Sequence, residues 1–290
     1  MKRIFYLTLT VVTLGFIFSC EPVEDRESLP AITLTPEMLN FSVVQNPLKN
    51  NEVTFTNLDP KVIPYWSYSD GNGELGHYNS NVQKVFLPFA GTYTVNFTAL
   101  TPGGSVYAKP VTVVVDQNDS AYFSDPRWGY LTNGEDGKTW VLDMVKPLSF
   151  LGKPEGYVNI AVSGEGWYPF LSEIPWAGLE DKNWGEVTFN LDGGYNVSVT
   201  QTSPVAGSTA QTTTKGSYTF QLTDDSVDDK LIFNGGLEML HPNEASYFSP
   251  SFSFSNIKIV QLTDDSLCYI AIRADNDWLI YHFIPKPTPN

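Results

Sequence analysis

Residues 186–200 read EVTFNLDGGYNVSVT, and this stretch decides the fold. In each half, apolar and polar residues alternate, so that one face of an extended chain is apolar and the other is polar. Between the halves, Asp192-Gly193-Gly194 supplies the positive φ angles that a tight hairpin needs. The stretch therefore predicts two antiparallel strands, over 186–191 and 195–200, joined by a turn.

The same two-residue period recurs along the chain and predicts an all-β protein. Residues 92–99 (TYTVNFTA) alternate in the same way. Further strands are predicted at 111–115, 217–222, 230–233, 253–262, 267–273 and 278–284. No segment carries a sustained apolar stripe of helical period, and 22 Gly and 20 Pro mark turns. This pattern is typical of antiparallel sandwiches, so we expect less than about one tenth of the mature chain to be helical.

A boundary near residues 116–120 (DQNDS) divides the chain into two domains, over 31–116 and 120–290. The length suits two domains better than one small sandwich. The composition also changes there, because Trp66 is the only one of the 7 tryptophans that precedes the boundary. We expect a hinge near residues 116–121.

The N-terminus predicts an exported, lipid-anchored protein. Lys2 and Arg3 precede an apolar run over 4–18, which is too short to span a bilayer comfortably, and Ser19 and Cys20 follow. This order predicts a signal peptide over residues 1–19. With cysteine at the cleavage point, the segment resembles the lipobox of bacterial lipoproteins. The resemblance implies diacylation of Cys20, with a signal peptide and an incidental cysteine as the alternative.

Residues 20–30 form an acidic tether, in which 21–27 read EPVEDRE. This tether is similar to the stretch that routes some Gram-negative lipoproteins to the outer face of the outer membrane. Removal of residues 1–19, which hold two basic and no acidic residues, changes the formal charge from −15 to −17. A chain so acidic repels phosphate backbones, so we expect no nucleic-acid partner. The remaining cysteine, Cys268, is predicted to fill a small buried apolar role.

The first domain contains two motifs that resemble those of one protein family. Residues 65–73 (YWSYSDGNG) resemble the Trp-x-Phe-Gly-Asp-Gly stretch of PKD domains, and residues 89–95 (FAGTYTV) match that family's Pro-Gly-Thr-Tyr-Thr-Val strand. The resemblance implies an immunoglobulin-like sandwich that acts as a spacer. From its alternating position on a central strand, we expect Trp66 to pack in the core rather than to stack on a ligand.

The second domain opens with residues 137–143 (GKTWVLD) and closes with residues 278–286 (WLIYHFIPK). Placed after a PKD-like domain in a lipoprotein, this combination resembles the glycan-binding surface lipoproteins that accompany SusC/SusD-type transporters. The resemblance implies a larger antiparallel β-sandwich of jelly-roll type. It also implies that the protein captures a polysaccharide at the cell surface for uptake, beside such a transporter. It identifies the class of protein and no binding residues.

The candidate site comes from the residues of the second domain. Residues 164–170 (GEGWYPF), 174–178 (IPWAG) and 183–185 (NWG) show little alternation and many turn residues. Loops lie at the surface, and flat aromatic rings flanked by hydrogen-bonding groups suit the apolar C–H faces of sugars. The candidate stacking and supporting residues are Trp167, Tyr168, Trp176, Asn183 and Trp184. The alternative is that some of these tryptophans fold back over the sheet as a lid.

The other tryptophans have different expected places. Trp140 and Trp278 stand in or beside alternating apolar runs, which favours the core or its rim. Trp128 precedes the rest of the second domain and is expected near the interdomain link, where it could pack between the domains.

The sequence favours a binding protein over an enzyme. A glycoside hydrolase needs two carboxylates across the scissile bond, but the Glu-x-Asp-x-x-Glu pattern of β-glucanase sandwiches is absent, as are Gly-x-Ser-x-Gly and His/Glu metal motifs. A glycoside hydrolase or lyase on the same scaffold, and an adhesin or structural spacer, remain the alternatives. No cofactor is expected. The acidic turns at 224–229 and 264–265 could hold Ca²⁺, with solvated hairpin tips as the other interpretation.

Overall fold

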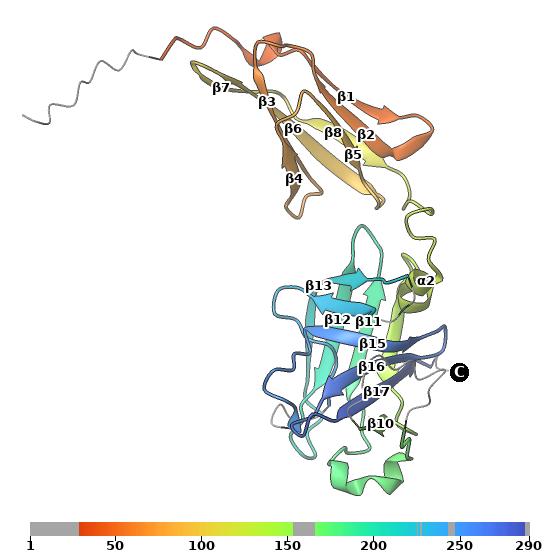
Figure 1. Ribbon diagram of the computed structural model, residues 1–290. Helices are drawn as coiled ribbons and strands as arrows, with labels where there is room; N and C mark the ends of the chain where they lie inside the picture. Colours follow the sequence, from red (N-terminus) through yellow and green to blue (C-terminus); the bar gives the residue numbers. More distant parts are fainter. Residues whose placement is uncertain (1–28, 153–165, 225, 227, 243–246, 288–290) are drawn as a thin grey trace, which may run out of the picture.

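The computed structural model describes residues 29–152, 166–224, 226, 228–242 and 247–287. Two β domains follow one another along the chain, and Figure 1 shows them as two lobes joined by one link. The predicted all-β class is confirmed, because the helices of the described residues are α2 (Pro126–Thr132) and three 3₁₀ turns. None of these helices is long and apolar enough to cross a bilayer. The predicted signal peptide and Cys20 lie outside the described residues.

The first domain is a sandwich of two antiparallel sheets. Its elements are η1 (Pro36–Met38), β1 (Phe41–Asn46), β2 (Lys49–Asn57), β3 (Ile63–Ser69), β4 (Glu74–Tyr78), β5 (Val82–Phe86), β6 (Gly91–Thr101), β7 (Gly104–Tyr107) and β8 (Val111–Val115). One sheet has the order β1-β2-β5. The other has the order β4-β3-β6-β7, and β8 also pairs with β6.

Trp66 lies at the centre of this first core, as predicted. Its side chain is completely buried, and its ring contacts Phe55 and Phe97 at centroid distances of 5.3 and 4.5 Å. The indole N–H donates to the carbonyl of Ser80 at 3.1 Å, so burial leaves no unpaired donor on this ring.

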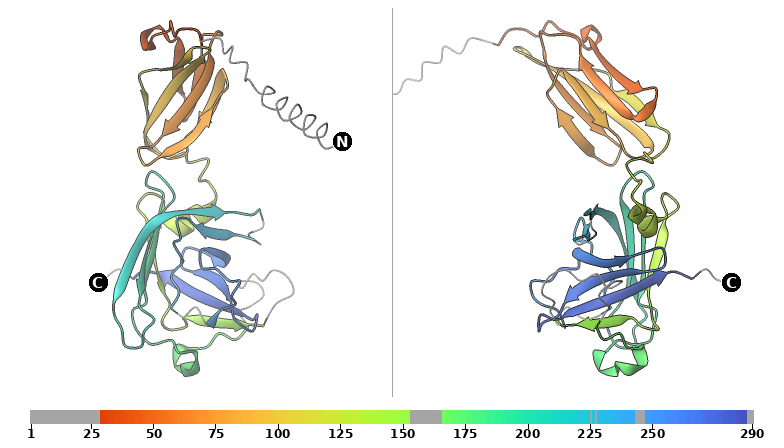
Figure 2. Two further views of the ribbon diagram at one scale, coloured as in Figure 1. Left: turned by 90° about the vertical axis from the view of Figure 1, so that its left-hand side faces the viewer. Right: turned by 45° about the vertical axis from the view of Figure 1, so that its right-hand side comes forward.

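The second domain is built on one antiparallel sheet that closes on itself. Its elements after α2 are β9 (Lys138–Leu142), β10 (Leu148–Leu151), η2 (Leu171–Glu173), η3 (Pro175–Ala177), β11 (Gly185–Asn190), β12 (Asn196–Thr202), β13 (Gln211–Gln221), β14 (Lys230–Phe233), β15 (Asn256–Leu262), β16 (Leu267–Ile272) and β17 (Trp278–Pro285). Strands β11 to β17 pair in chain order, and β9 joins β11 to β17, which closes a barrel-like sheet of eight strands. The additional strand β10 pairs with the first half of β17. Figure 2 shows this sheet curving around the core.

The predicted hairpin at 186–200 is confirmed. Strands β11 and β12 pair with Phe189 opposite Val197, and Gly193 in the turn has φ 67°. The inward residues of both strands are buried, which follows from the alternation in the sequence. Strand β13 begins six residues before the predicted start at 217. Its first half, residues 211–216 (QTTTKG), is exposed on both faces and therefore carries no alternation.

Helix α2 packs against the barrel beside the link. Asp125 caps it by accepting from the backbone N–H of Arg127 at 2.9 Å. Trp140 is completely buried, and its indole N–H donates to Leu131 O at 3.0 Å, which ties the helix to β9. Trp128 is 7 % exposed and stacks on Tyr195 at 5.4 Å, so it packs in the core of the second domain.

Residues of the link contact both domains. The side chain of Asn118 accepts from Ala90 N at 2.7 Å and donates to Leu191 O at 2.9 Å. Phe89 of the first domain packs into the core cluster of the second, with its ring 4.7 Å from that of Tyr195. The predicted hinge at 116–121 is thus bridged by hydrogen bonds on both sides, and its motion stays a prediction.

Candidate functional site

Residues 166–184 lie at the end of the second domain that is farther from the first domain (Figures 1 and 2). Trp167 forms an antiparallel bridge with Phe150 of β10, with N–O distances of 2.9 and 3.1 Å. The chain then forms the two short 3₁₀ turns, η2 and η3. Pro175 begins η3, and Gly178 ends it in the left-handed conformation with φ 67°. The predicted loop therefore has a defined backbone.

Two of the predicted tryptophans come together on this surface. The Trp167 and Trp176 side chains are 49 % and 56 % exposed, their ring centroids are 6.0 Å apart, and their planes differ by 15°. Phe150 supports both, with ring distances of 5.4 and 5.2 Å. We call Phe150, Trp167 and Trp176 the aromatic platform. Gly166 adopts φ 72°, and a side chain there would overlap the carbonyl of Phe150, so a glycine lets Trp167 approach β10.

A charged pair lies beside the platform. The guanidinium of Arg273 is 5.9 Å from the Phe150 ring and 3.1 Å from the carboxylate of Asp275. Sequence analysis missed Phe150, on β10, and Arg273, just after β16, because the two are far apart in the chain and neither belongs to the turn-rich segment. The platform therefore combines apolar ring faces with a hydrogen-bonding edge.

Tyr168 faces a different part of the molecule. Its ring stacks on His282 at 4.3 Å, and the ammonium of Lys146 lies 4.6 Å from the ring centroid. Successive residues of an extended segment point to opposite sides, so Trp167 and Tyr168 cannot share one face. Tyr168 covers His282 instead of extending the platform.

Trp184 is a buried residue, which does not fit the stacking role predicted for it. The side chain is 3 % exposed and belongs to the core of the second domain. Its indole N–H donates to Glu180 O at 2.9 Å, and the ammonium of Lys182 lies 4.3 Å from the ring. The same ammonium donates to the carbonyls of Ser203 and Ser208 at 3.1 and 3.2 Å, which closes the loop over Trp184. The burial of Trp184 agrees with the alternative that some of the candidate tryptophans fold back over the sheet as a lid.

Asn183 is exposed and stands apart from the platform. Its side-chain oxygen accepts from Gly185 N at 2.8 Å, which shapes the start of β11. It lines a cavity of about 450 Å³ together with Trp184 and Lys286, and neither platform tryptophan lines that cavity. Of the five predicted residues, only Trp167 and Trp176 belong to the aromatic platform.

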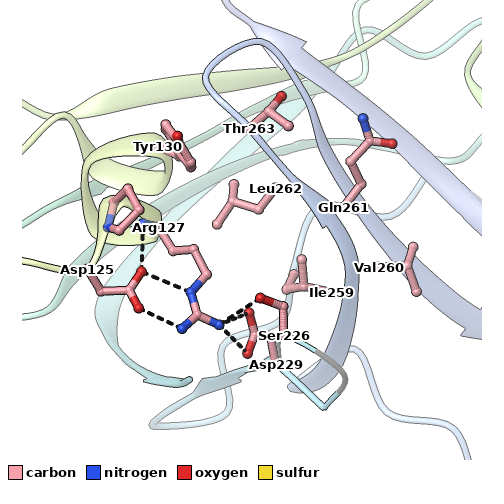
Figure 3. A pocket seen from close by; sticks show the side chains of 11 residues that line it. Asp125, Arg127, Tyr130, Ser226, Asp229, Ile259, Val260, Gln261, Leu262 and Thr263 are labelled. Carbon is pink, nitrogen blue, oxygen red and sulfur yellow. Dashed lines mark hydrogen bonds and ion pairs between the residues drawn. The ribbon is translucent and has the colours of Figure 1, made fainter. Parts of the chain in front are cut away.

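A cavity of about 400 Å³ beside α2 has a structural role (Figure 3). Arg127 donates from Nη1 to both carboxylate oxygens of Asp229, at 3.0 and 2.9 Å. It also donates from Nε and Nη2 to Asp125, at 2.9 and 2.6 Å. These hydrogen bonds raise the pKa of Arg127 and lower that of Asp125. Because the one guanidinium is shared between the two carboxylates of Asp125 and Asp229, its hydrogen-bond donors are engaged inside the protein, and the cluster attaches α2 to the barrel.

The acidic turns considered for Ca²⁺ form ion pairs with lysines. Asp228 binds Lys258 at 2.8 Å, and Asp264 binds Lys138 at 2.7 Å. Within the described ranges, no three His, Cys, Asp or Glu side chains gather closely enough to hold a metal ion. Asp225 lies outside those ranges.

No family model matches the sequence, and no curated protein matches it. The resemblances to PKD domains and to transporter-associated lipoproteins therefore rest on the sequence motifs. The function has to be inferred from the geometry of the residues.

Proposed function

We propose that this protein is a lipid-anchored surface protein that captures a neutral polysaccharide on the aromatic platform without cleaving it. The observation that carries the proposal is the pair of half-exposed, nearly parallel indole rings of Trp167 and Trp176. Exposed tryptophans with a common orientation offer flat apolar surfaces to sugar rings. The nearby Arg273 and Asp275 supply donors and acceptors for hydroxyl groups.

The placement of the platform supports the same function. The described chain begins at the far end of the first domain, and the platform lies at the opposite end of the molecule (Figures 1 and 2). A lipid on Cys20 would therefore hold the first domain near the membrane and direct the platform outward. The first domain then acts as a spacer, and a SusC/SusD-type transporter beside it would receive the captured glycan.

The electrostatics favour binding over hydrolysis. A glycosidase needs a carboxyl group whose pKa is raised, so that it can act as a general acid near neutral pH. Among the described residues, every carboxyl group with a resolved shift has a lowered pKa, chiefly because a hydrogen bond stabilises the charged form. These groups are Glu37, Glu52, Asp125, Glu180 and Asp228.

Native gels that contain single polysaccharides test the proposal. Trp167→Ala and Trp176→Ala should each abolish retardation by the polysaccharide that retards the parent, with a loss of affinity of about tenfold or more, equivalent to about 1.4 kcal/mol. Because both rings are half exposed, the melting temperature should stay close to that of the parent. Phe170→Ala is the matched control, since Phe170 is 49 % exposed in the same segment and lies outside the platform.

The outcomes separate the alternatives. Unchanged retardation of both tryptophan variants would refute the platform. Release of oligosaccharides, seen by chromatography, would indicate a hydrolase or lyase, and no retardation by any polysaccharide would favour an adhesin or spacer. The anchor is tested separately, because Cys20→Ala should abolish labelling by a fatty-acid probe and release the protein from the outer membrane.

A further inference from the structure

A third cavity lies between the two domains, at the opposite end of the barrel from the platform. Its volume is about 800 Å³, within the range of roughly 300–1,000 Å³ that small-ligand sites occupy. The turn between β11 and β12 points toward the first domain (Figure 1), and a side chain built on Gly193 would come within 3.8 Å of Ala90 O. Both domains therefore contribute to the walls of this interdomain cleft.

Aromatic rings form much of these walls. Tyr68, Phe89 and Tyr93 come from the first domain, and Tyr195 comes from the second. Burial raises the pKa of Tyr68 to about 12, and it also raises the pKa of Tyr195. Both phenols therefore stay neutral at physiological pH and can exchange hydrogen bonds with a hydroxylated ligand.

The polar groups of the cleft balance in charge. Among the residues that the structure describes, Asp70 and Lys215 are the only Asp, Glu, Lys or Arg side chains that line it, and their formal charges cancel. The whole chain, in contrast, has a formal charge of −15. Neutral donors and acceptors come from Asn72 and Ser217. A long-range negative field disfavours anionic ligands, and the balanced lining offers no excess charge to a cation.

Contacts between the domains give the cleft its shape. Phe89, which lines it, packs into the core of the second domain, and Asn118 bridges the two domains through its amide. The hydroxyl groups of Tyr122 and Tyr195 lie 3.2 Å apart. Because the walls are already ordered, less conformational entropy of the protein is lost when a ligand binds.

We propose that the interdomain cleft is a second binding site, which takes a short neutral oligosaccharide. Sugar rings have apolar C–H faces edged by hydroxyl groups, and the cleft pairs aromatic walls with neutral hydrogen-bonding groups and no net charge. The two sites lie at opposite ends of the barrel, so binding in the cleft does not depend on the aromatic platform.

Glycine amides report on both sites in one experiment. Gly193 and Gly194 line the cleft, whereas Gly166 precedes Trp167 of the platform. The two-domain protein, labelled with ¹⁵N-glycine, is titrated with linear neutral tri- to hexasaccharides of glucose, mannose, xylose and galactose. At least one oligosaccharide should shift the amide signals of Gly193 and Gly194, in the parent and in Trp167→Ala alike.

Matched variants on β13 locate the binding. Ser217 lines the cleft and is exposed, so Ser217→Trp should fill the cleft and weaken this binding by about tenfold or more. Thr219→Trp places the same ring two residues along the same exposed face, outside the cleft lining, and should leave the affinity within about twofold of the parent. Thermal unfolding checks that both variants fold.

Three results would overturn the inference. One is that Gly193 and Gly194 respond to no oligosaccharide while Gly166 does, which would leave the platform as the site and refute the cleft alone. Another is that the shifts of Gly193 and Gly194 persist unchanged in a folded Ser217→Trp protein. The third is that no glycine responds to any sugar, which would count against both sites.

Discussion

The burial of His282 should make this protein less stable in mild acid. The side chain lies on β17 and is 5 % exposed. Its Nε2 is 2.9 Å from Ser149 Oγ, its Nδ1 is 3.2 Å from Cys268 Sγ, and the Tyr168 ring covers it. A neutral imidazole donates from one nitrogen and accepts at the other, so a hydroxyl and a thiol satisfy the neutral form. None of these three contacts is with a carboxylate, which would stabilise the charged form of the imidazole.

The sign and size of this loss of stability follow from the pKa of His282. Burial, together with the positive charge of Lys146, lowers the pKa of His282 from 6.5 to about 4. Below pH 6.5 the unfolded chain therefore binds a proton that the folded chain does not. Stability is complete above pH 6.5 and is lost as the pH falls toward 4, by about 2 kcal/mol at pH 5 and about 3 kcal/mol at pH 4.

Urea denaturation at several pH values between 4 and 7 measures this loss. The comparison is with His282→Gln, which keeps a polar side chain and removes the titration. The parent should lose about 3 kcal/mol more than the variant between pH 7 and pH 4. The carboxyl groups titrate in both proteins, so the difference between the two curves isolates His282.

Equal pH dependence of the two proteins would refute the reasoning. So would a direct NMR titration in which the imidazole of His282, identified by its loss in the variant, protonates near pH 6.5. If the protein lost stability as the pH rose through the same range, the predicted sign of the pH effect would be wrong.

Three further predictions concern stability. Trp184→Ala should destabilise the protein by about 3–5 kcal/mol in urea denaturation, because the ring is in the core; a loss below about 1 kcal/mol would show that the ring is not packed there. Gly185→Ala should prevent folding or cost several kcal/mol, since Gly185 has φ 110° and a Cβ would overlap the carbonyl of Thr200; a soluble protein with the parent's melting temperature would disagree. Asp229→Ala should cost about 1.5–3 kcal/mol, because it removes the hydrogen bonds between Arg127 and Asp229 while Asp125 still pairs with the guanidinium; an unchanged urea midpoint would contradict this.

Much of the fold is predictable from local pattern. The alternation of 186–200 gives β11, its turn and β12, because a strand with one buried face must alternate with a period of two. Trp66 is predictable as a core residue for the same reason. The first half of β13 is not, since residues 211–216 are exposed on both faces and only pairing with β12 makes them a strand. The closure of the sheet through β9 and β17 is also invisible to local pattern.

The candidate site, like the fold, was predictable only in part from the sequence. The sequence by itself determined that residues 164–185 are rich in turn residues and aromatic rings, a composition from which a surface for hydroxylated ligands is predicted. Only the tertiary structure decided which rings face outward. Trp176 and Trp184 stand in similar local sequences, yet one is 56 % exposed and the other 3 %. Contacts with residues far away in the chain make the difference, because a ring is buried only when other segments fold over it. Phe150 supports Trp176 from beneath, whereas the loop at 203–208 binds Lys182 over Trp184.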